Sequence, residues 1–206
     1  MNSALFGLVM VMVAMPFPQD GAVPVEKEPS HKTVLTNDYV QAFRVTLQPG
    51  ETTLMHIHSH DDAAVRLSSA TTAADSPGQP MGPPEQVSPG FVSVRDTGSK
   101  PLTHRVHNVG TTVFDVIDVQ VLKRPPGPAS TPIATPAAEN ASMRVYRYEL
   151  EPGAGTPQHT HVRPYLLVAV TDINLRMTSP DGSSMEDQVK AGDRRWGDST
   201  VTLATI

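Results

Sequence analysis

One pattern occurs twice in the sequence at a constant offset. Residues 40–58 read VQAFRVTLQPGETTLMHIH, and residues 143–161 read MRVYRYELEPGAGTPQHTH. Each copy is an alternating apolar run followed by Pro-Gly and, after a short spacer, by His-x-His. Internal similarity of this kind indicates two copies of one structural module, so the fold has to accommodate a pair of related units.

The segments around this pattern are typical of β-structure. In residues 40–47 the side chains of Phe43, Val45 and Leu47 share one face, which is the alternation of a half-buried strand. Residues 68–90 are rich in Ser, Thr, Ala, Pro and Gly and are expected to form a long loop. Other strands are expected at residues 64–67, 91–95, 102–108 and 111–122, and in the second module at 143–150, 165–170, 173–177, 185–190 and 201–206.

The two histidines of the first copy fall in a strand expected over residues 54–58. Because successive side chains of a strand point to opposite faces, Leu54, His56 and His58 are expected to lie on one face. Two imidazoles placed in this way can bind one metal ion.

The composition excludes several kinds of site and partner. The chain has no cysteine, so a metal site has to be built from histidine, carboxylates and water. The formal net charge is −5 and no basic cluster is present, which argues against nucleic acid as a partner.

The N-terminal apolar run, Ala4 to Met15, is too short to span a bilayer and fits the core of a secretory signal. This predicts a secreted or periplasmic protein without an integral membrane span. The alternative is an N-terminal strand or a misplaced start codon in a cytoplasmic protein. Four segments are expected: a signal-like segment with a loose lead-in (1–36), a first barrel (37–123), a Pro/Ala-rich linker (124–142) and a second module (143–206).

Two motifs resemble those of the cupin family. The first is Gly50-x5-His56-x-His58-x3-Asp62, and the second is His104-x3-Asn108. The resemblance covers most of residues 38–122, and a weaker copy covers 143–206, so the chain resembles a bicupin. The resemblance implies an all-β chain of tandem jelly-roll barrels, the C-terminal one truncated.

The same resemblance implies a metal site in the first barrel. It would hold one divalent ion, Fe, Mn, Ni or Zn, through His56, His58 and His104. The fourth ligand position falls on Asp62, where the family usually has the longer Glu, so Asp62 would complete or tune the centre. The neighbouring His60 and Asp61 are the alternatives for this position.

The second module departs from the family pattern. His159 and His161 match the first motif, but the carboxylate position falls on Tyr165. The third histidine should lie between about residues 203 and 207, at Leu203 or beyond the last residue of the sequence. The module is therefore expected to hold no metal, and it would be a truncated product, a frameshifted reading frame or half a barrel that a homodimer completes.

Three further residues have two interpretations each. His107 has the opposite parity to His104 in its strand and is expected to face outward. Asn108 is expected to make turn hydrogen bonds rather than to bind metal. Arg66 is expected either to point inward, where it can bind an anionic substrate, or to form a salt bridge at the rim.

Two functions are compatible with such a site. The first is a metal-dependent enzyme acting on a small molecule, most plausibly an oxidoreductase of dioxygenase type, because three histidines and a carboxylate leave coordination positions open. The second is a non-catalytic cupin that binds a small molecule or has a structural role.

Overall fold

The computed structural model describes residues 21–126, 134–156, 159–161, 163–178, 181–197 and 201–203. Apart from one 3-10 turn, η1 (Val25–Lys27), the regular elements of these segments are strands. The predicted all-β class is therefore confirmed. The expected secretory signal lies outside the described residues, and within them no helix is long and apolar enough to cross a membrane.

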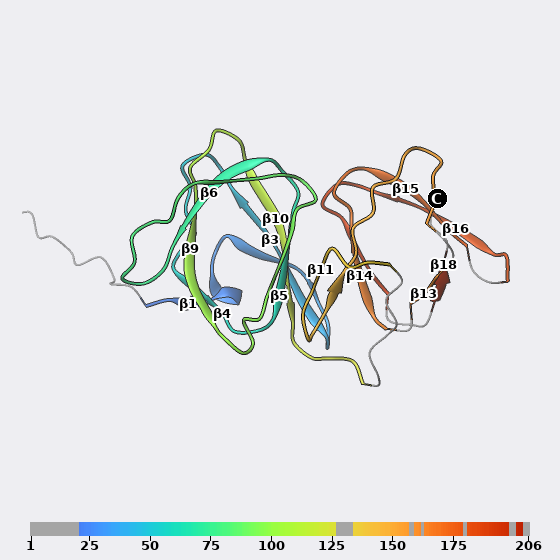
Figure 1. Cartoon of the computed structure of the whole chain (residues 1–206), viewed down its shortest axis with the longest axis horizontal. Helices are drawn as coiled ribbons and strands as arrows, with labels where there is room; N and C mark the ends of the chain where they lie inside the picture. Colours follow the sequence, from blue (N-terminus) through green and yellow to red (C-terminus); the bar gives the residue numbers. More distant parts are fainter. Residues whose placement is uncertain are drawn as a thin grey trace, which may run out of the picture.

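Residues 21–126 form a barrel of two facing five-stranded sheets (Figure 1). The first sheet has the order β1 (Val23–Pro24), β4 (His56–His58), β9 (Leu102–Asn108), β6 (Ala70–Asp75) and β7 (Glu85–Val87). The second has the order β2 (His31–Thr36), β3 (Val40–Leu47), β10 (Phe114–Val121), β5 (Asp62–Arg66) and β8 (Val92–Arg95). Strand pairs in both sheets are antiparallel except β1–β4, and this is the jelly-roll architecture that the sequence predicted.

The apolar core of the barrel comes from the inward faces of both sheets. On β3 the predicted alternation is observed, with Phe43, Val45 and Leu47 all buried. Burying each such side chain stabilises the fold by about 1.5–3 kcal/mol. Val45 and Leu47 belong to an apolar cluster that also contains Ala64, Ala70, Val87, Phe114 and Val116.

Two predictions for the first barrel were wrong. Residues 21–36 are not a loose lead-in, because β1 pairs with β4 and β2 pairs with β3. The sequence did not indicate β2 because many of its side chains are polar. This is possible because β2 lies at the edge of its sheet with one face exposed. Residues 68–90 are not one long loop either, because β6 hydrogen-bonds to β9 and β7; its small residues and threonines carry little strand signal.

The strand that carries the first histidine pair is shorter than predicted. It begins at His56 rather than at residue 54, and Leu54 is 52% exposed instead of sharing the inward face. The chain turns here because the backbone N–H of Thr53 bonds to Val106 and that of Leu54 bonds to Glu28.

The second half contains only two-stranded sheets within the described residues. They are β11 (Ala138–Glu139) with β12 (Arg144–Val145), β13 (His159–His161) with β18 (Val201–Leu203), β14 (Tyr165–Val168) with β17 (Arg194–Gly197), and β15 (Ile173–Thr178) with β16 (Ser184–Val189). A small apolar cluster of Ala169, Leu175 and Val189 lies among them. The segment expected to be a linker, residues 124–142, therefore contains the short strand β11. That the second half is an incomplete jelly roll remains a prediction.

The alternating run at 143–150 does not form the expected strand. Only β12 is extended and paired, and Tyr148 and Leu150 are 45% and 42% exposed. Its counterpart β3 is hydrogen-bonded on both sides, to β2 and to β10. Among the described residues no strand stands beside 146–150 in this way, so alternation alone does not produce a strand there.

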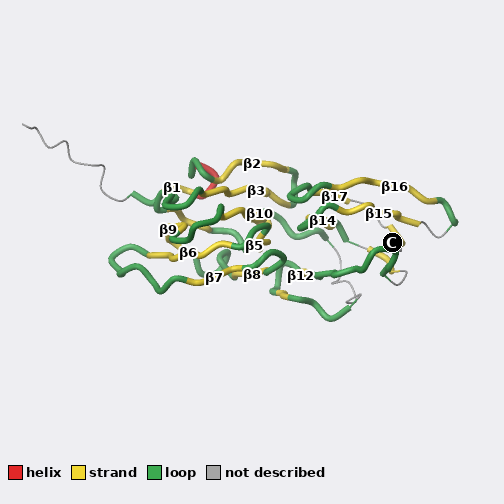
Figure 2. The backbone as a smooth tube through the Cα atoms, turned by 90° about the horizontal axis from the view of Figure 1, so that it is seen from above, coloured by secondary structure: helices red, strands yellow, loops and turns green. Residues whose placement is uncertain are grey.

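The two halves lie side by side, as Figures 1 and 2 show from two directions. Trp196 stacks on Tyr39 with ring centroids 6.1 Å apart, and Arg194 Nε donates a hydrogen bond of 3.1 Å to the carbonyl of Val34. The second half thus packs against the end of the β2–β3 hairpin.

Candidate metal centre

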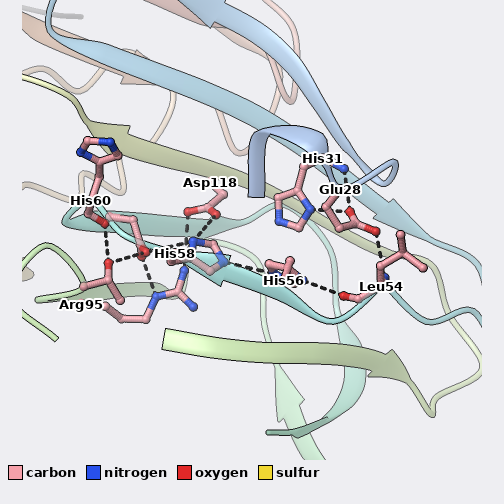
Figure 3. A network of polar contacts seen from close by, with 10 residues as sticks. Glu28, His31, Leu54, His56, His58, His60, Arg95 and Asp118 are labelled. Atoms are coloured by element: carbon pink, nitrogen blue, oxygen red, sulfur yellow. Dashed lines mark hydrogen bonds and ion pairs between the residues drawn. The ribbon is translucent and has the colours of Figure 1, made fainter. Parts of the chain in front are cut away.

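His56 and His58 point into the barrel from β4 (Figure 3). Each is 1% exposed, and their Nε2 atoms are 3.1 Å apart. The spacing of two residues places both rings on the inward face, as predicted.

His104 joins them from the neighbouring strand. β4 and β9 are antiparallel, and His104 is the direct partner of His56 in their register. Its ring centroid is 4.6 Å from that of His56 and 5.2 Å from that of His58. Nε2 of His104 is buried and has no hydrogen-bond partner, so the two motifs meet in space at three imidazoles.

A fourth histidine, which the sequence analysis missed, completes the group. His31 is the first residue of β2 and is buried. Its ring centroid is 4.7 Å from that of His56 and 6.0 Å from that of His58. One ligand atom from each of His31, His56 and His58 lies within 4.8 Å of the others, a spacing that a single ion can bridge.

The Nδ1 atoms of three rings are held from behind. Nδ1 of His31 lies 2.6 Å from Oε2 of Glu28, and Nδ1 of His56 lies 2.8 Å from the carbonyl of Leu54. Nδ1 of His58 lies 3.2 Å from Oδ2 of Asp62, which is an ion-pair distance without hydrogen-bond geometry. A ring that donates its Nδ1–H to such an acceptor keeps the Nε2 lone pair free, which is how proteins orient histidines toward a metal.

Burial keeps two of the imidazoles neutral. Desolvation lowers the pKa of His56 to about 4, and desolvation with the nearby His56 lowers the pKa of His104 to about 2. Both rings are therefore unprotonated at neutral pH. Since a metal binds the neutral imidazole, these residues can bind a cation without first losing a proton.

Glu28 is a buried anion at the edge of the cluster. Its Oε2 accepts hydrogen bonds from the backbone N–H groups of Ser30 and His31, and its Oε1 accepts one of 3.0 Å from the N–H of Leu54. Burial opposes its ionisation, but the hydrogen bond with His31 and these backbone bonds lower its pKa to about 2. Glu28 therefore supplies a fixed negative charge behind His31.

Asp62 lies behind His58. It is fully buried, Oδ1 accepts a hydrogen bond of 2.6 Å from Arg95 Nε, and Oδ2 accepts one of 3.0 Å from Thr97 Oγ1. Burial opposes its ionisation, but the bond with His58 and the charge of Arg95 outweigh burial and lower its pKa. Ligand atoms of His58, Asp62 and Asp118 also lie within 4.8 Å of one another, so this carboxylate pair borders the histidine cluster on one side.

The two alternatives to Asp62 lie elsewhere. The side chain of His60 is exposed. Asp61 accepts hydrogen bonds from the backbone N–H of Gly98 and from Ser142 Oγ, which ties the first barrel to the last residue of the expected linker. Neither residue belongs to the two groups of potential ligands among the described residues, and His104, although its ring adjoins His56 and His58, is not part of these groups either.

The structure decides between the two interpretations given for each of His107, Asn108 and Arg66. His107 lies outside the cluster, as expected from its parity, and bonds to Asp75 and Thr52. Asn108 donates hydrogen bonds to the carbonyls of Leu47 and Thr112, which confirms its structural role. Arg66 points inward and forms no ion pair within the described part of the chain, so the expected rim salt bridge is absent.

The histidines border a cavity of about 310 Å³ inside the barrel. Its lining includes the four histidines, Arg66, Arg95 and Asp118 together with apolar residues. The apolar lining includes Val45, Ala64, Val106, Phe114 and Val116. A small organic molecule fits a space of this size and character.

The corresponding place in the second half lacks most of these groups. Nε2 atoms of His159 and His161 are 3.0 Å apart, as in the first half. In the β13–β18 register, however, the partner of His159 is Leu203. Tyr165, at the position of Asp62, stacks on His161 with ring centroids 4.3 Å apart. From the sequence, the position that corresponds to His104 could be Leu203 or a later one. The β13–β18 register assigns this position to Leu203.

Four residues of the candidate site were not predicted from the sequence: Glu28, His31, Arg95 and Asp118. Three of them carried a readable signal. Glu28-x2-His31 pairs an acid with a histidine in an otherwise unremarked segment, and Asp118 interrupts the most apolar strand of the chain. An acid inside such a strand is costly unless it has a partner, and Arg95 is that partner, 3.6 Å away.

No family model matches the chain. No curated protein matches it either. Ninety-eight chains of solved structures do match. A cupin domain from Bordetella pertussis Tohama I is 22% identical, covers 45% of this chain and 92% of its own, and has a TM-score of 0.40.

Two further structures show the range of these neighbours. An RmlC-like cupin with a double-stranded β-helix fold from Methanocaldococcus jannaschii is 12% identical, with coverages of 55% and 93% and a TM-score of 0.37. The DMSP lyase DddQ from Ruegeria pomeroyi DSS-3 is 16% identical, with coverages of 41% and 39% and a TM-score of 0.32. The strand order of residues 21–126 carries the fold assignment and confirms the predicted jelly-roll architecture.

Proposed function

We propose that the first barrel binds one divalent cation through Nε2 atoms of His31, His56, His58 and His104. The observation that carries the proposal is the buried Nε2 of His104, which has no hydrogen-bond partner among the described residues. The ring of His104 lies next to those of His56 and His58, with centroids 4.6 and 5.2 Å away, and the Nε2 atoms of these two rings are 3.1 Å apart. An unsatisfied nitrogen in a protein interior costs about 1–3 kcal/mol. A bound cation would accept the lone pairs of these Nε2 atoms. It would thereby remove this cost and the repulsion between the lone pairs of His56 and His58.

The donor set fits a borderline divalent ion. Imidazole nitrogen suits Fe, Mn, Ni and Zn, and no thiolate is available in this chain. Glu28, the carbonyl of Leu54 and Asp62 hold the rings of three of these histidines from behind. Asp62 then tunes the centre through His58 instead of binding the ion itself.

The function that this site supports best is a small-molecule oxidoreductase of dioxygenase type. A bound cation would supply an open coordination position for a substrate oxygen or for O₂. The residues of the chain do the rest: apolar side chains exclude water from the cavity, and the ion pairs of Arg95 with Asp62 and Asp118 keep the histidine face rigid.

A second candidate is a cupin that binds a small molecule without converting it. One observation favours it: both carboxylates that border the histidines, Asp62 and Asp118, lie next to Arg95. An acid held in this way is a poor proton acceptor, because protonation would remove its ion pair with the arginine.

Elemental analysis of the purified chain tests the metal site. The native protein is expected to retain about one equivalent of Fe, Mn, Ni or Zn, and His56→Ala is expected to retain little. His60→Ala is the matched control, since its side chain is exposed. Oxygen consumption in the presence of candidate substrates then separates the two functions. A native protein that takes up no divalent metal would sink the proposal.

A further inference from the structure

Two arginines line the cavity, and their environments differ. Arg95 is neutralised, with Asp62 2.6 Å away and Asp118 3.6 Å away. Arg66 forms no ion pair with any described residue, and its buried Nε has no hydrogen-bond partner. The cavity therefore contains one cation whose charge is not compensated by direct contact.

The position of Arg66 follows from the strand that carries it. The inward residues of β5 are Asp62, Ala64 and Arg66, so Arg66 lies on the same side of the sheet as the carboxylate behind His58. Its guanidinium carbon is 5.3 Å from the ring centroid of Phe114. A cation above an aromatic face is partly stabilised, but its donors remain unused.

Arg66 remains charged at neutral pH despite its burial. Desolvation is the main cause that lowers its pKa, to about 10, and the charge of Arg95 acts in the same direction. Glu85 also lines the cavity, but it is exposed and forms no ion pair with Arg66. A half-buried guanidinium whose Nε is buried without a partner among the described residues is costly, and a bound anion would remove this cost.

We infer that Arg66 binds the carboxylate of a small organic acid in the cavity shared with the histidine cluster. The planar guanidinium matches a carboxylate in a two-point hydrogen-bonded pair. Phe114, Val116 and Val106 supply an apolar surface for a short hydrocarbon body, and the cavity of about 310 Å³ limits the size of the acid. The inference deepens the proposed function and rests on it, because the acid is taken to be the substrate or ligand of the histidine centre.

The first experiment uses the metal-free full-length protein, so that it reports on Arg66 alone. Sodium propionate is titrated while the Nε–H signal of Arg66 is followed by NMR, with the neutral propionamide as the matched ligand. We expect propionate to shift this signal and raise Tm, and propionamide to do neither. Arg66→Met should weaken propionate binding by about tenfold or more, and Arg66→Lys should weaken it less than Arg66→Met does. Lys32→Met, which removes an exposed cation, should leave propionate binding unchanged.

A second readout separates binding from a structural role. Because Arg66→Met removes a buried, unpaired charge, Tm of the ligand-free variant should rise. Uptake of Co(II) by Arg66→Met should match the native protein, whereas His56→Ala should lose Co(II) but keep propionate binding. Failure of Co(II) uptake in the native protein would count against the metal centre. Equal propionate affinity in the native protein and Arg66→Met, or no binding to the native protein at 50 mM, would overturn the inference.

Discussion

Leu203 is the direct partner of His159 across the β13–β18 ladder. In the first half, the corresponding partner of His56 is His104. The two halves therefore place the same His-x-His pair on equivalent strands, but only the first half places an imidazole opposite it. Together with Tyr165 at the position of Asp62, this difference separates the two modules.

This asymmetry predicts the stoichiometry of metal binding. His159→Ala is expected to leave the metal content at about one equivalent, because Tyr165 and Leu203 supply no third strong ligand. His56→Ala is expected to abolish it. Elemental analysis of both variants after dialysis gives the answer, and loss of metal from His159→Ala would show that the second half takes part.

Glu28 is predicted to control metal affinity from behind His31. Glu28→Gln keeps the size of the side chain but removes the charge that orients the ring, and such changes typically weaken binding 10–100-fold. The exposed Glu26 provides the matched control, Glu26→Gln, which should bind as the native protein does. Competition with a chromogenic chelator measures both affinities; an unchanged affinity in Glu28→Gln would exclude His31 from the ligand set.

The buried pair of Asp62 and Arg95 is predicted to be important for stability. Asp62→Asn leaves Arg95 with only Asp118 and breaks a buried ion pair, which should lower the free energy of unfolding by about 3 kcal/mol. Glu139→Gln breaks the more exposed pair with Arg144 and should cost at most about 1 kcal/mol. Urea titrations of the metal-free variants compare the two; similar losses would contradict the assigned burial.

Asp75 gives a prediction for the dependence of stability on pH. Hydrogen bonds from Arg105 and then His107 lower the pKa of Asp75 below its ordinary value of 3.8. A lowered pKa in the folded state means that Asp75 contributes stability above the unfolded value and loses it as pH falls below about 4. The difference in unfolding free energy between the native protein and Asp75→Asn should be constant from pH 5 to 7 and shrink at lower pH. Asp38→Asn, at an exposed position, should show no such trend.

Much of the first barrel could be predicted from local pattern. The alternation of Phe43, Val45 and Leu47 defined β3 with its observed limits, and the range 102–108 coincides with β9. The pairing of His-x-His with His104 also followed from the motifs. Alternation is written into consecutive residues, and a strand buried on one face has to show it.

Other features depended on contacts between distant segments. His31 reaches the centre only because β2 pairs with β3, and its strand carries a polar outer face that hides the pattern. Asp62 has the predicted spacing, yet its carboxylate turns to Nδ1 of His58 because Arg95 and Thr97 hold it there. The sequence specifies which residues are available, but the direction of each side chain depends on neighbours that come from other strands.

The sequence by itself determined the repeat, the β class and three of the four histidines at the proposed centre. The tertiary structure decided that Leu203 stands opposite His159 in the β13–β18 register. It also decided that, within the described part of the chain, residues 146–150 pair with no strand and Arg66 forms no ion pair in the cavity. The physical reason is the same in each case. Strand periodicity is a local property of the chain, whereas register and charge pairing exist only once strands far apart in the sequence lie side by side.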